Sequence, residues 1–237
     1  MFAYKTLSGP NNGAFVFADH ASNHIPDWIE DFGVSDDDLA RHIAWDIGTE
    51  TVARDLCERL SCAGLLCGFS RLVIDANREP GTDGSIPTVS DGTPIPGNFD
   101  LTVPHAQERK TRLHDGYHTA LGNALDLRPE TLAISVHSFT PQLQGEPKRS
   151  TDIGLLVKED SERAVAFIRN MGEIAPDLQV DVNEPYSAHD LNHTIDHNIV
   201  PRGLRHLVIE LRQDHIGTKV EALRMAQKLA RAIRPLI

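Results

Sequence analysis

The chain has 237 residues, of which 40% are hydrophobic and 24% are charged, and its formal net charge is −11 at pH 7. These values are typical of one globular α/β domain over residues 1–237. The acidic balance and the lack of a basic run argue against nucleic acid or an anionic membrane as a partner. No apolar run approaches the roughly 20 residues of a membrane span, and no signal peptide is evident, so we expect a cytoplasmic protein.

Hydrophobic periodicity predicts strands that alternate with helices. The first predicted elements are a buried strand over 14–18, a helix over 49–60, apolar runs over 64–70 and 71–76, and a helix from Pro104 to Asp126. Later elements are strands that end in His137 and Glu210, strands over 153–157 and 178–182, and helices over 161–174 and 217–233, the former capped by Asp160 or Ser161. This order predicts a three-layer α/β/α sandwich with a mixed, largely parallel central sheet.

Two long polar segments interrupt the pattern. Glu79–Val103 contains four prolines and four glycines, and loops of this length are often functional, so we predict a lid or pocket wall. Glu184–Pro201 carries His189, His193 and His197 at intervals of four residues. That spacing suggests a second metal site. However, the segment is polar on all sides, and we predict a solvated or substrate-facing loop instead.

Three apolar runs end in or near residues that can do chemistry, namely His20, His137 and Glu210. Working groups of open α/β sheets lie beyond the carboxyl ends of the strands, so these residues predict one site. A catalytic zinc takes three protein ligands of N or O type and leaves a position for water. His20 and His137 are the best candidates, and either Asn23 or Asp46 is the third ligand.

Glu210 is expected at the same edge of the sheet. Its carboxylate would accept a proton from a metal-bound water and pass it to a leaving amine. The alternative role for this residue is a structural ion pair with Arg212 or Arg202.

Arg78 is the candidate anchor for an anionic substrate, because a guanidinium grips a carboxylate through two parallel hydrogen bonds. Asn77 can add a donor beside it, and Arg71 is a weaker candidate for the same role. The alternative for Arg78 is a salt bridge with Glu79 or Asp75.

Ser138 and His118 are expected to line the substrate pocket. Ser138 has no identifiable His-Asp partners, and the Gly-x-Ser-x-Gly pattern of serine hydrolases is absent. Phosphate-binding loops of the Gly-x-Gly-x-x-Gly kind are absent too. The sequence therefore favours metal-assisted chemistry at this site.

Four short motifs carry a family resemblance: Asp19–His24 (DHASNH), Trp45–Gly48 (WDIG), Arg71–Arg78 (RLVIDANR) and Ser135–Ser138 (SVHS). With them, the chain resembles the N-formylglutamate amidohydrolase family over nearly its whole length. That family is similar to the zinc carboxypeptidases and the succinylglutamate desuccinylases. The resemblance implies a hydrolase-like, zinc-exopeptidase-like sandwich and metal-assisted hydrolysis of an N-acyl amino acid. The type activity releases formate and glutamate, a step of histidine degradation.

The carboxypeptidase-like pattern has a His-x-x-Glu that supplies two ligands and a later His that supplies the third. His20 matches the first position and His137 the last, whereas Asn23 stands where Glu is expected. The resemblance also implies that Arg78, with Asn77, holds the substrate carboxylate. Glu210 resembles the catalytic glutamate that lies late in the chains of that family.

The resulting hypothesis is a Zn²⁺-dependent amidohydrolase, with another divalent metal as an alternative cofactor. Its partner would be a small anionic N-acyl amino acid, and its assembly a monomer or a small homo-oligomer. Two alternatives stay open. One is the same fold and metal acting on another N-acyl amino acid or small peptide. The other is a metal-free binding protein for amino-acid-like anions, which Asn23 keeps in consideration.

Overall fold

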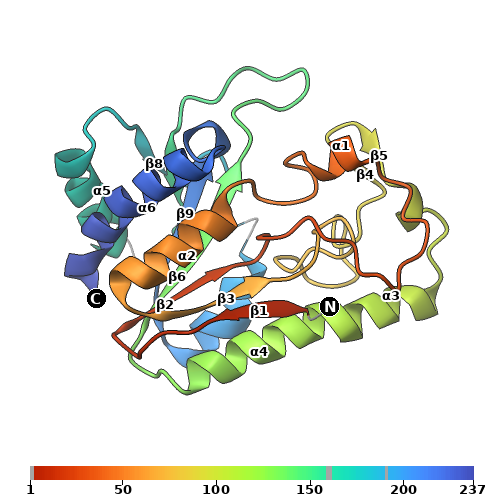
Figure 1. Cartoon of the computed structure of the whole chain (residues 1–237), viewed down its shortest axis with the longest axis horizontal. Helices are drawn as coiled ribbons and strands as arrows, with labels where there is room; N and C mark the ends of the chain where they lie inside the picture. The colour runs from red at the N-terminus through yellow and green to blue at the C-terminus, as the bar shows by residue number, and fades with distance from the viewer. Residues whose placement is uncertain (1–2, 159–161, 190–191) are drawn as a thin grey trace.

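A seven-stranded sheet lies at the centre of the protein, with strand order β1-β3-β2-β6-β9-β7-β8 (Figure 1). The computed structural model describes residues 3–158, 162–189 and 192–237. Its strands are β1 (Tyr4–Leu7), β2 (Ala14–Ala18), β3 (Ala63–Cys67), β6 (Leu132–Phe139), β7 (Ile153–Leu155), β8 (Val180–Val182) and β9 (Arg205–Arg212). Among these, β1·β3 and β7·β9 are antiparallel, and the other neighbours are parallel. The predicted mixed, largely parallel sheet is confirmed.

The predicted helices are also present. They are α2 (Thr49–Leu60), α3 (Val103–Arg109), α4 (Asp115–Asp126), α5 (Glu162–Ile174) and α6 (Lys219–Ile233). A further short helix, α1, covers Asp36–Leu39. A π-helical turn, Lys110–His114, joins α3 to α4, so that one continuous helix covers 103–126. Short turns of helix are Pro96–Asn98, Ile195–Ile199, Val200–Arg202, Gln213–His215 and Arg234–Leu236. The N-cap predicted at Asp160 or Ser161 lies outside the described residues.

Side chains along each central strand alternate between two hydrophobic layers. On β2, Val16 packs into a layer that includes residues of α2, α5 and α6, whereas Phe15 and Phe17 pack into a layer that includes residues of α4. This alternation follows from the two-residue repeat of a strand. Helices therefore cover both faces of the sheet (Figure 1), and the predicted three-layer sandwich is confirmed.

The parallel register brings the ends of the three central strands to one edge. Phe17 pairs with Ser135 between β2 and β6, and His137 pairs with Glu210 between β6 and β9. Because β2 ends at Ala18, the next residues of the chain leave the sheet at this level. The sheet thus places three distant parts of the chain at one site.

Three segments differ from the sequence-based expectations. The tail of Glu184–Pro201 is helical from residue 193 onward, because Ile195 and Ile199 are buried in the α4 layer. The prediction that this segment is polar on all sides is wrong there. The run Arg71–Ala76 is buried but irregular, and Glu79–Val103 contains a small hairpin, β4 (Val89–Ser90) and β5 (Thr93–Pro94).

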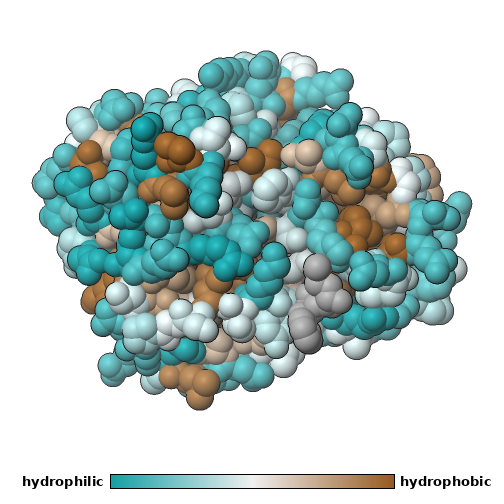
Figure 2. Space-filling view, viewed as in Figure 1, coloured by the Kyte–Doolittle hydropathy of each residue, from teal (hydrophilic) through white to brown (hydrophobic). Residues whose placement is uncertain are grey.

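Hydrophilic residues cover most of the face seen in Figure 2, and hydrophobic residues there form separate groups. None of the helices in the described residues combines the length and the hydropathy needed to cross a membrane. The surface in this view therefore shows no broad hydrophobic face.

Candidate active site

A cavity of about 140 Å³ lies at the carboxyl ends of β2, β6 and β9. Eight of the ten predicted site residues line it: His20, Asp46, Arg71, Asn77, Arg78, His137, Ser138 and Glu210. Asn23 and His118 are not among its lining residues. The remaining lining residues are His42, Asp75, Phe139, Thr140 and Tyr186. The structure thus assembles most of the predicted site from five separate stretches of the chain.

Two imidazoles and one carboxylate form the centre of this site. His137 Nδ1 lies 3.0 Å from Asp46 Oδ2, and His20 Nδ1 lies 3.4 Å from the same oxygen. Each of the three side chains offers a ligand atom within 4.8 Å of the others, and all are at least 96% buried. His20 Nδ1 makes no hydrogen bond with the residues that the structure describes. We call His20, Asp46 and His137 the first cluster.

The outer nitrogens of both histidines face carboxylates. His20 Nε2 lies 2.7 Å from Asp75 Oδ1, and His137 Nε2 lies 3.3 Å from Asp19 Oδ2. Tyr117 donates its hydroxyl proton to the other oxygen of Asp19 at 2.7 Å. Such outer carboxylates fix the ring orientation and tautomer of metal-binding histidines. These three roles were not predicted from the sequence, although both aspartates lie within the motifs that carry the resemblance.

Asp46 is held in place from two sides. Arg71 donates to Asp46 Oδ1 at 3.2 Å and to Asp75 Oδ2 at 2.7 Å, so it joins the two carboxylates. The backbone N–H of Ser138 donates to Asp46 Oδ2 at 3.2 Å, and its hydroxyl donates to the carbonyl of Ile47 at 2.9 Å. Arg71 and Ser138 therefore help to position the first cluster, besides lining the cavity.

Four carboxyl groups surround the two imidazoles of the site. They are those of Asp19, Asp46, Asp75 and Glu210. Burial lowers the pKa of His137, but hydrogen bonds with Asp19 and Asp46 outweigh it and hold that pKa well above its ordinary value. Burial and Arg71 lower the pKa of His20, yet Asp75 and Asp46 leave it raised. Protons on these rings compensate the carboxylates in the protein alone, and a divalent cation would replace them.

Glu210 stands beside this cluster without a partner of its own. It pairs with His137 in the β-sheet register, its side chain is buried, and no hydrogen bond or ion pair within the described part of the chain engages it. Arg212 and Arg202 bind other aspartates, so the structural ion pair considered from the sequence is not formed. Burial, with help from the carboxylate of Asp46, raises the pKa of Glu210 to about 7 although His137 opposes the shift.

Arg78 also lacks a partner for its side chain. Glu79 and Asp75 pair with other residues, and the guanidinium of Arg78 makes no hydrogen bond or ion pair among residues 3–158, 162–189 and 192–237. Asn77 beside it is fixed, because its Oδ1 accepts the backbone N–H of Thr194 at 2.9 Å. A half-buried cation thus faces the cavity, free to receive an anion.

Two predicted site residues lie elsewhere. Asn23 donates its side-chain N–H to the carbonyl of Leu39 at 2.9 Å, so the structure brings Asp46 and not Asn23 to the two histidines. His118 lines a second cavity on the other side of Ala76. Its ring is drawn there by a hydrogen bond to the Ala76 carbonyl, a tertiary contact that the sequence does not reveal.

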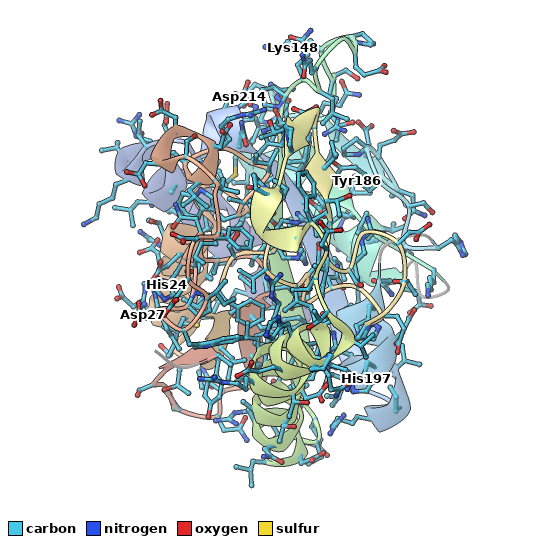
Figure 3. All side chains as sticks on the ribbon, turned by 90° about the vertical axis from the view of Figure 1, so that its right-hand side faces the viewer. His24, Asp27, Lys148, Tyr186, His197 and Asp214 are labelled. Atoms are coloured by element: carbon cyan, nitrogen blue, oxygen red, sulfur yellow. The ribbon has the colours of Figure 1, made fainter. Side chains whose placement is uncertain are left out.

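The predicted pocket walls contribute unequally. Tyr186, from Glu184–Pro201, lines the cavity, and its hydroxyl accepts a hydrogen bond from Arg149. Figure 3 shows Tyr186 on the side of the molecule opposite to His24. No described residue of Glu79–Val103 lines this cavity. That loop borders a different cavity, of about 860 Å³, so the prediction that it forms a wall of this pocket is wrong.

The family model described as N-formylglutamate amidohydrolase matches residues 14–217. The chain belongs to the N-formylglutamate amidohydrolase family. It is accordingly a hydrolase that acts on an amide bond, and the resemblance carried by the four short motifs is confirmed.

Two solved structures share the fold of this chain. A gene product of Agrobacterium tumefaciens is 32% identical, with a TM-score of 0.90 over 100% of this chain and 95% of that chain. An N-formylglutamate amidohydrolase from Ralstonia eutropha JMP134 is 20% identical, with a TM-score of 0.69 over 100% of both chains. No curated protein sequence matches this member of the family significantly.

Proposed function

We propose that this amidohydrolase requires a divalent metal, Zn²⁺ in the first place, and cleaves a small N-acyl amino acid of the N-formyl-L-glutamate type. Water adds across the amide C–N bond, so that the products are formate and glutamate. The observation that carries the proposal is the convergence of His20 Nδ1 and His137 Nδ1 on one oxygen of Asp46. Glu210 and Arg78, both without partners among the described residues, line the same cavity.

The residues of the first cluster suit such a metal. Two imidazole nitrogens and one carboxylate are a frequent zinc ligand set, and a buried nitrogen without a partner, His20 Nδ1, needs one. Asp75 and Asp19 supply the outer carboxylates that metal-binding histidines usually have. When bound, the metal would polarise the acyl oxygen and make water more acidic. Asn23 is not part of the proposed ligand set.

Protein side chains supply the remaining chemistry. Arg78, assisted by Asn77, would bind the substrate carboxylate through parallel hydrogen bonds and so fix the amide in the cavity. Glu210 would take a proton from the attacking water and give it to the leaving nitrogen. A pKa of about 7 supports this double role, because a group that both accepts and donates a proton works best near the ambient pH.

The cavity also favours a small anionic substrate. Its volume of about 140 Å³ is below the roughly 300–1,000 Å³ of common ligand pockets, which supports an amino acid derivative over a peptide. We include a cytoplasmic location in the proposal, since the three cysteines are buried and unpaired. Nucleic acid and membrane are not among the proposed partners, and the assembly is a monomer or a small homo-oligomer.

The test compares wild type with the His20→Ala/His137→Ala double variant, both purified without chelators or an affinity tag. We expect the variant to contain about one equivalent less zinc, one metal per site, and to lose turnover of N-formyl-L-glutamate. If the wild type hydrolysed another N-acyl amino acid and not N-formyl-L-glutamate, that compound would replace N-formyl-L-glutamate as the proposed substrate. Equal zinc contents and no turnover of any N-acyl amino acid would favour a metal-free binding protein and sink the proposal.

A further inference from the structure

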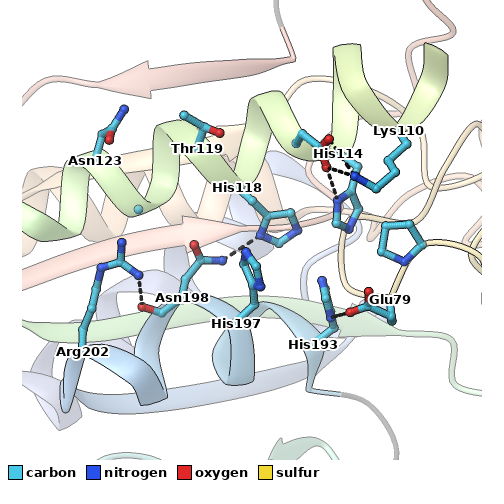
Figure 4. A pocket seen from close by; sticks show the side chains of 13 residues that line it. Glu79, Lys110, His114, His118, Thr119, Asn123, His193, His197, Asn198 and Arg202 are labelled. Atoms are coloured by element: carbon cyan, nitrogen blue, oxygen red, sulfur yellow. Dashed lines mark hydrogen bonds and ion pairs between the residues drawn. The ribbon is translucent and has the colours of Figure 1, made fainter. Parts of the chain in front are cut away.

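A second cavity, of about 410 Å³, contains four histidines that the reaction does not use. His114 and His118 lie on the helix that covers 103–126, and His193 and His197 lie on the helical turns opposite (Figure 4). Both pairs are four residues apart, so each pair presents its rings on one face of its helix. Figure 3 shows His197 on the same side of the molecule as Tyr186, but in a separate part of it.

The four rings are in close contact. The centroids of His114 and His118 lie 4.3 Å apart, and those of His114 and His193 lie 5.3 Å apart. The ring of His118 lies 5.2 Å from that of His193, and His197 stacks on His193 at 5.5 Å. His114, His118 and His193 each offer one nitrogen within 4.8 Å of the others. We call these three residues the second cluster.

One nitrogen of each ring is anchored, as metal-binding histidines usually are. His114 Nε2 lies 3.1 Å from the carbonyl oxygen of Arg78, and His118 Nε2 lies 2.8 Å from that of Ala76. His193 Nδ1 lies 3.3 Å from a carboxylate oxygen of Glu79. Donation of a proton to each of these oxygens leaves a lone pair on the opposite nitrogen of the ring.

The opposite nitrogens are buried, and two of them make no hydrogen bond with the described residues. These are His114 Nδ1 and His193 Nε2. The carboxylate closest to His114 Nδ1 is that of Asp115, whose Oδ1 lies 3.6 Å away. The third, His118 Nδ1, lies 2.7 Å from the side-chain nitrogen of Asn198. A buried polar atom without a partner is costly, so the cluster calls for a group that accepts electron pairs from several nitrogens at once.

Burial favours the uncharged form of these rings. With repulsion from His114, it lowers the pKa of His118 to about 3. Burial, with repulsion from His193, also lowers the pKa of His114. It lowers the pKa of His193 as well, although Glu79 opposes that shift. Neutral imidazole is the form that binds a metal, and an anion would instead require protonated rings. The neighbouring cations, Lys110 and Arg202, are already paired with aspartates.

We propose that His114, His118 and His193 form a second metal site, which takes a late first-row divalent ion of the Zn²⁺ class. Imidazole ligands suit zinc, copper and nickel. The three nitrogens already lie within 4.8 Å of one another, and on binding each would move to the roughly 2.0–2.1 Å of a zinc–nitrogen bond. Asn198 gives up its contact with His118 in this state. The fourth position faces the cavity, with His197 at its rim.

An ion at this site would brace the candidate active site. His114 and His118 hold the carbonyls of Arg78 and Ala76, and this short stretch carries Asn77 and Arg78 into the first cavity. The inference stands on the second cluster alone and does not depend on the proposed hydrolysis. Its role would be structural, because the two cavities share no lining residue.

The test counts zinc by elemental analysis and by calorimetric titration of the metal-free protein. We expect about two equivalents in wild type and about one in His118→Ala/His193→Ala, one metal per site. The matched control His105→Ala/His189→Ala changes two exposed histidines outside the cluster and should bind as wild type does. Retention of the first equivalent shows that the double variant is folded.

A second arm uses His193→Gln alone and Co²⁺ as a spectroscopic probe. In a His20→Ala/His137→Ala background, Co²⁺ absorption should reveal coordination by imidazoles, and His193→Gln should abolish that signal. An unchanged zinc count in His118→Ala/His193→Ala, or no Co²⁺ signal in the folded background variant, would overturn the inference. If His20→Ala/His137→Ala lost zinc and His118→Ala/His193→Ala did not, the second site would be rejected, whereas the proposed hydrolase function would still stand.

Discussion

The first and second clusters use the same side chain in opposite electrostatic surroundings. Around His20 and His137, buried carboxylates raise the pKa of both rings. Around His114, His118 and His193, burial and the neighbouring rings lower the pKa of each histidine. Burial opposes the charged form of the ring in both clusters. Around the first cluster, hydrogen bonds and attraction from the carboxylates outweigh burial. Around the second cluster, burial prevails, and Glu79 only partly offsets it at His193.

This contrast also separates the two proposed uses of a metal. Around the first cluster, Glu210 and Arg78 have no side-chain partner among the described residues and share a cavity with the proposed metal ligands. Around the second cluster, Lys110 and Arg202 are paired. The carboxylates of Glu79 and Asp115 line that cavity, but Glu79 pairs with His193 and Asp115 with Lys110. A proton-transfer group and a substrate anchor are what catalysis requires. We therefore assign chemistry to the first cluster and a structural role to the second.

The largest expected effect tests this division of roles. Glu210→Gln should lower kcat on N-formyl-L-glutamate on the order of 10²- to 10⁴-fold, the usual contribution of general acid–base catalysis, without changing the zinc content. His193→Ala should keep most of the turnover. Steady-state kinetics with metal analysis checks both variants, and Glu58→Gln, at an exposed position on α2, controls for the substitution. Near-wild-type turnover of Glu210→Gln would contradict the mechanism.

A smaller effect is expected from the substrate anchor. Arg78→Lys keeps the charge but loses the paired hydrogen bonds, so KM should rise about tenfold to a hundredfold, as expected for a lost charge-assisted hydrogen bond. Arg54→Lys, on the exposed side of α2, should leave KM unchanged. If KM of Arg78→Lys stayed at the wild-type value and only kcat fell, the anchor would have to be another residue.

The outer carboxylates give a paired comparison of the two clusters. Asp75→Asn should weaken zinc binding at the first cluster by about tenfold to a hundredfold, because the partner of His20 Nε2 is lost. Glu79→Gln should weaken binding at the second cluster by less, since Glu79 is largely exposed. Calorimetric titrations resolve the two sites. Asp83→Asn, at an exposed position, serves as control, and equal effects on both sites would argue against separate clusters.

The smallest effect concerns acid stability of the metal-free protein. The histidines of the second cluster have lowered pKa values in the folded protein. Below about pH 6.5 they therefore bind protons in the unfolded chain but not in the folded one, so the free energy of unfolding decreases as the pH is lowered. The first cluster acts in the opposite direction, because its raised pKa values stabilise the fold at low pH and cease to do so as pH rises. Histidine titrations by NMR should show two groups, one titrating above and one below the ordinary range.

Short-range patterns determined much of this protein. The helix at 49–60, the strand over 14–18 and the strands that contain His137 and Glu210 follow from hydrophobic periodicity, which local burial on a sheet imposes. The meeting of their ends was predictable, because parallel strands share an edge. Family membership followed from short motifs at that edge, which lie within the match over residues 14–217.

Tertiary structure decided which side chains meet. Asn23 and Asp46 were both candidates in the sequence for the third ligand. Only Asp46 reaches the two histidines, since Asn23 donates to the carbonyl of Leu39. His118, which pattern alone assigned to the substrate pocket, faces His193 across 75 residues of chain. Periodicity specifies the face on which a residue lies. The residues that a side chain contacts come from other elements of the fold. Their distance from it depends on tertiary packing, which no local sequence pattern predicts.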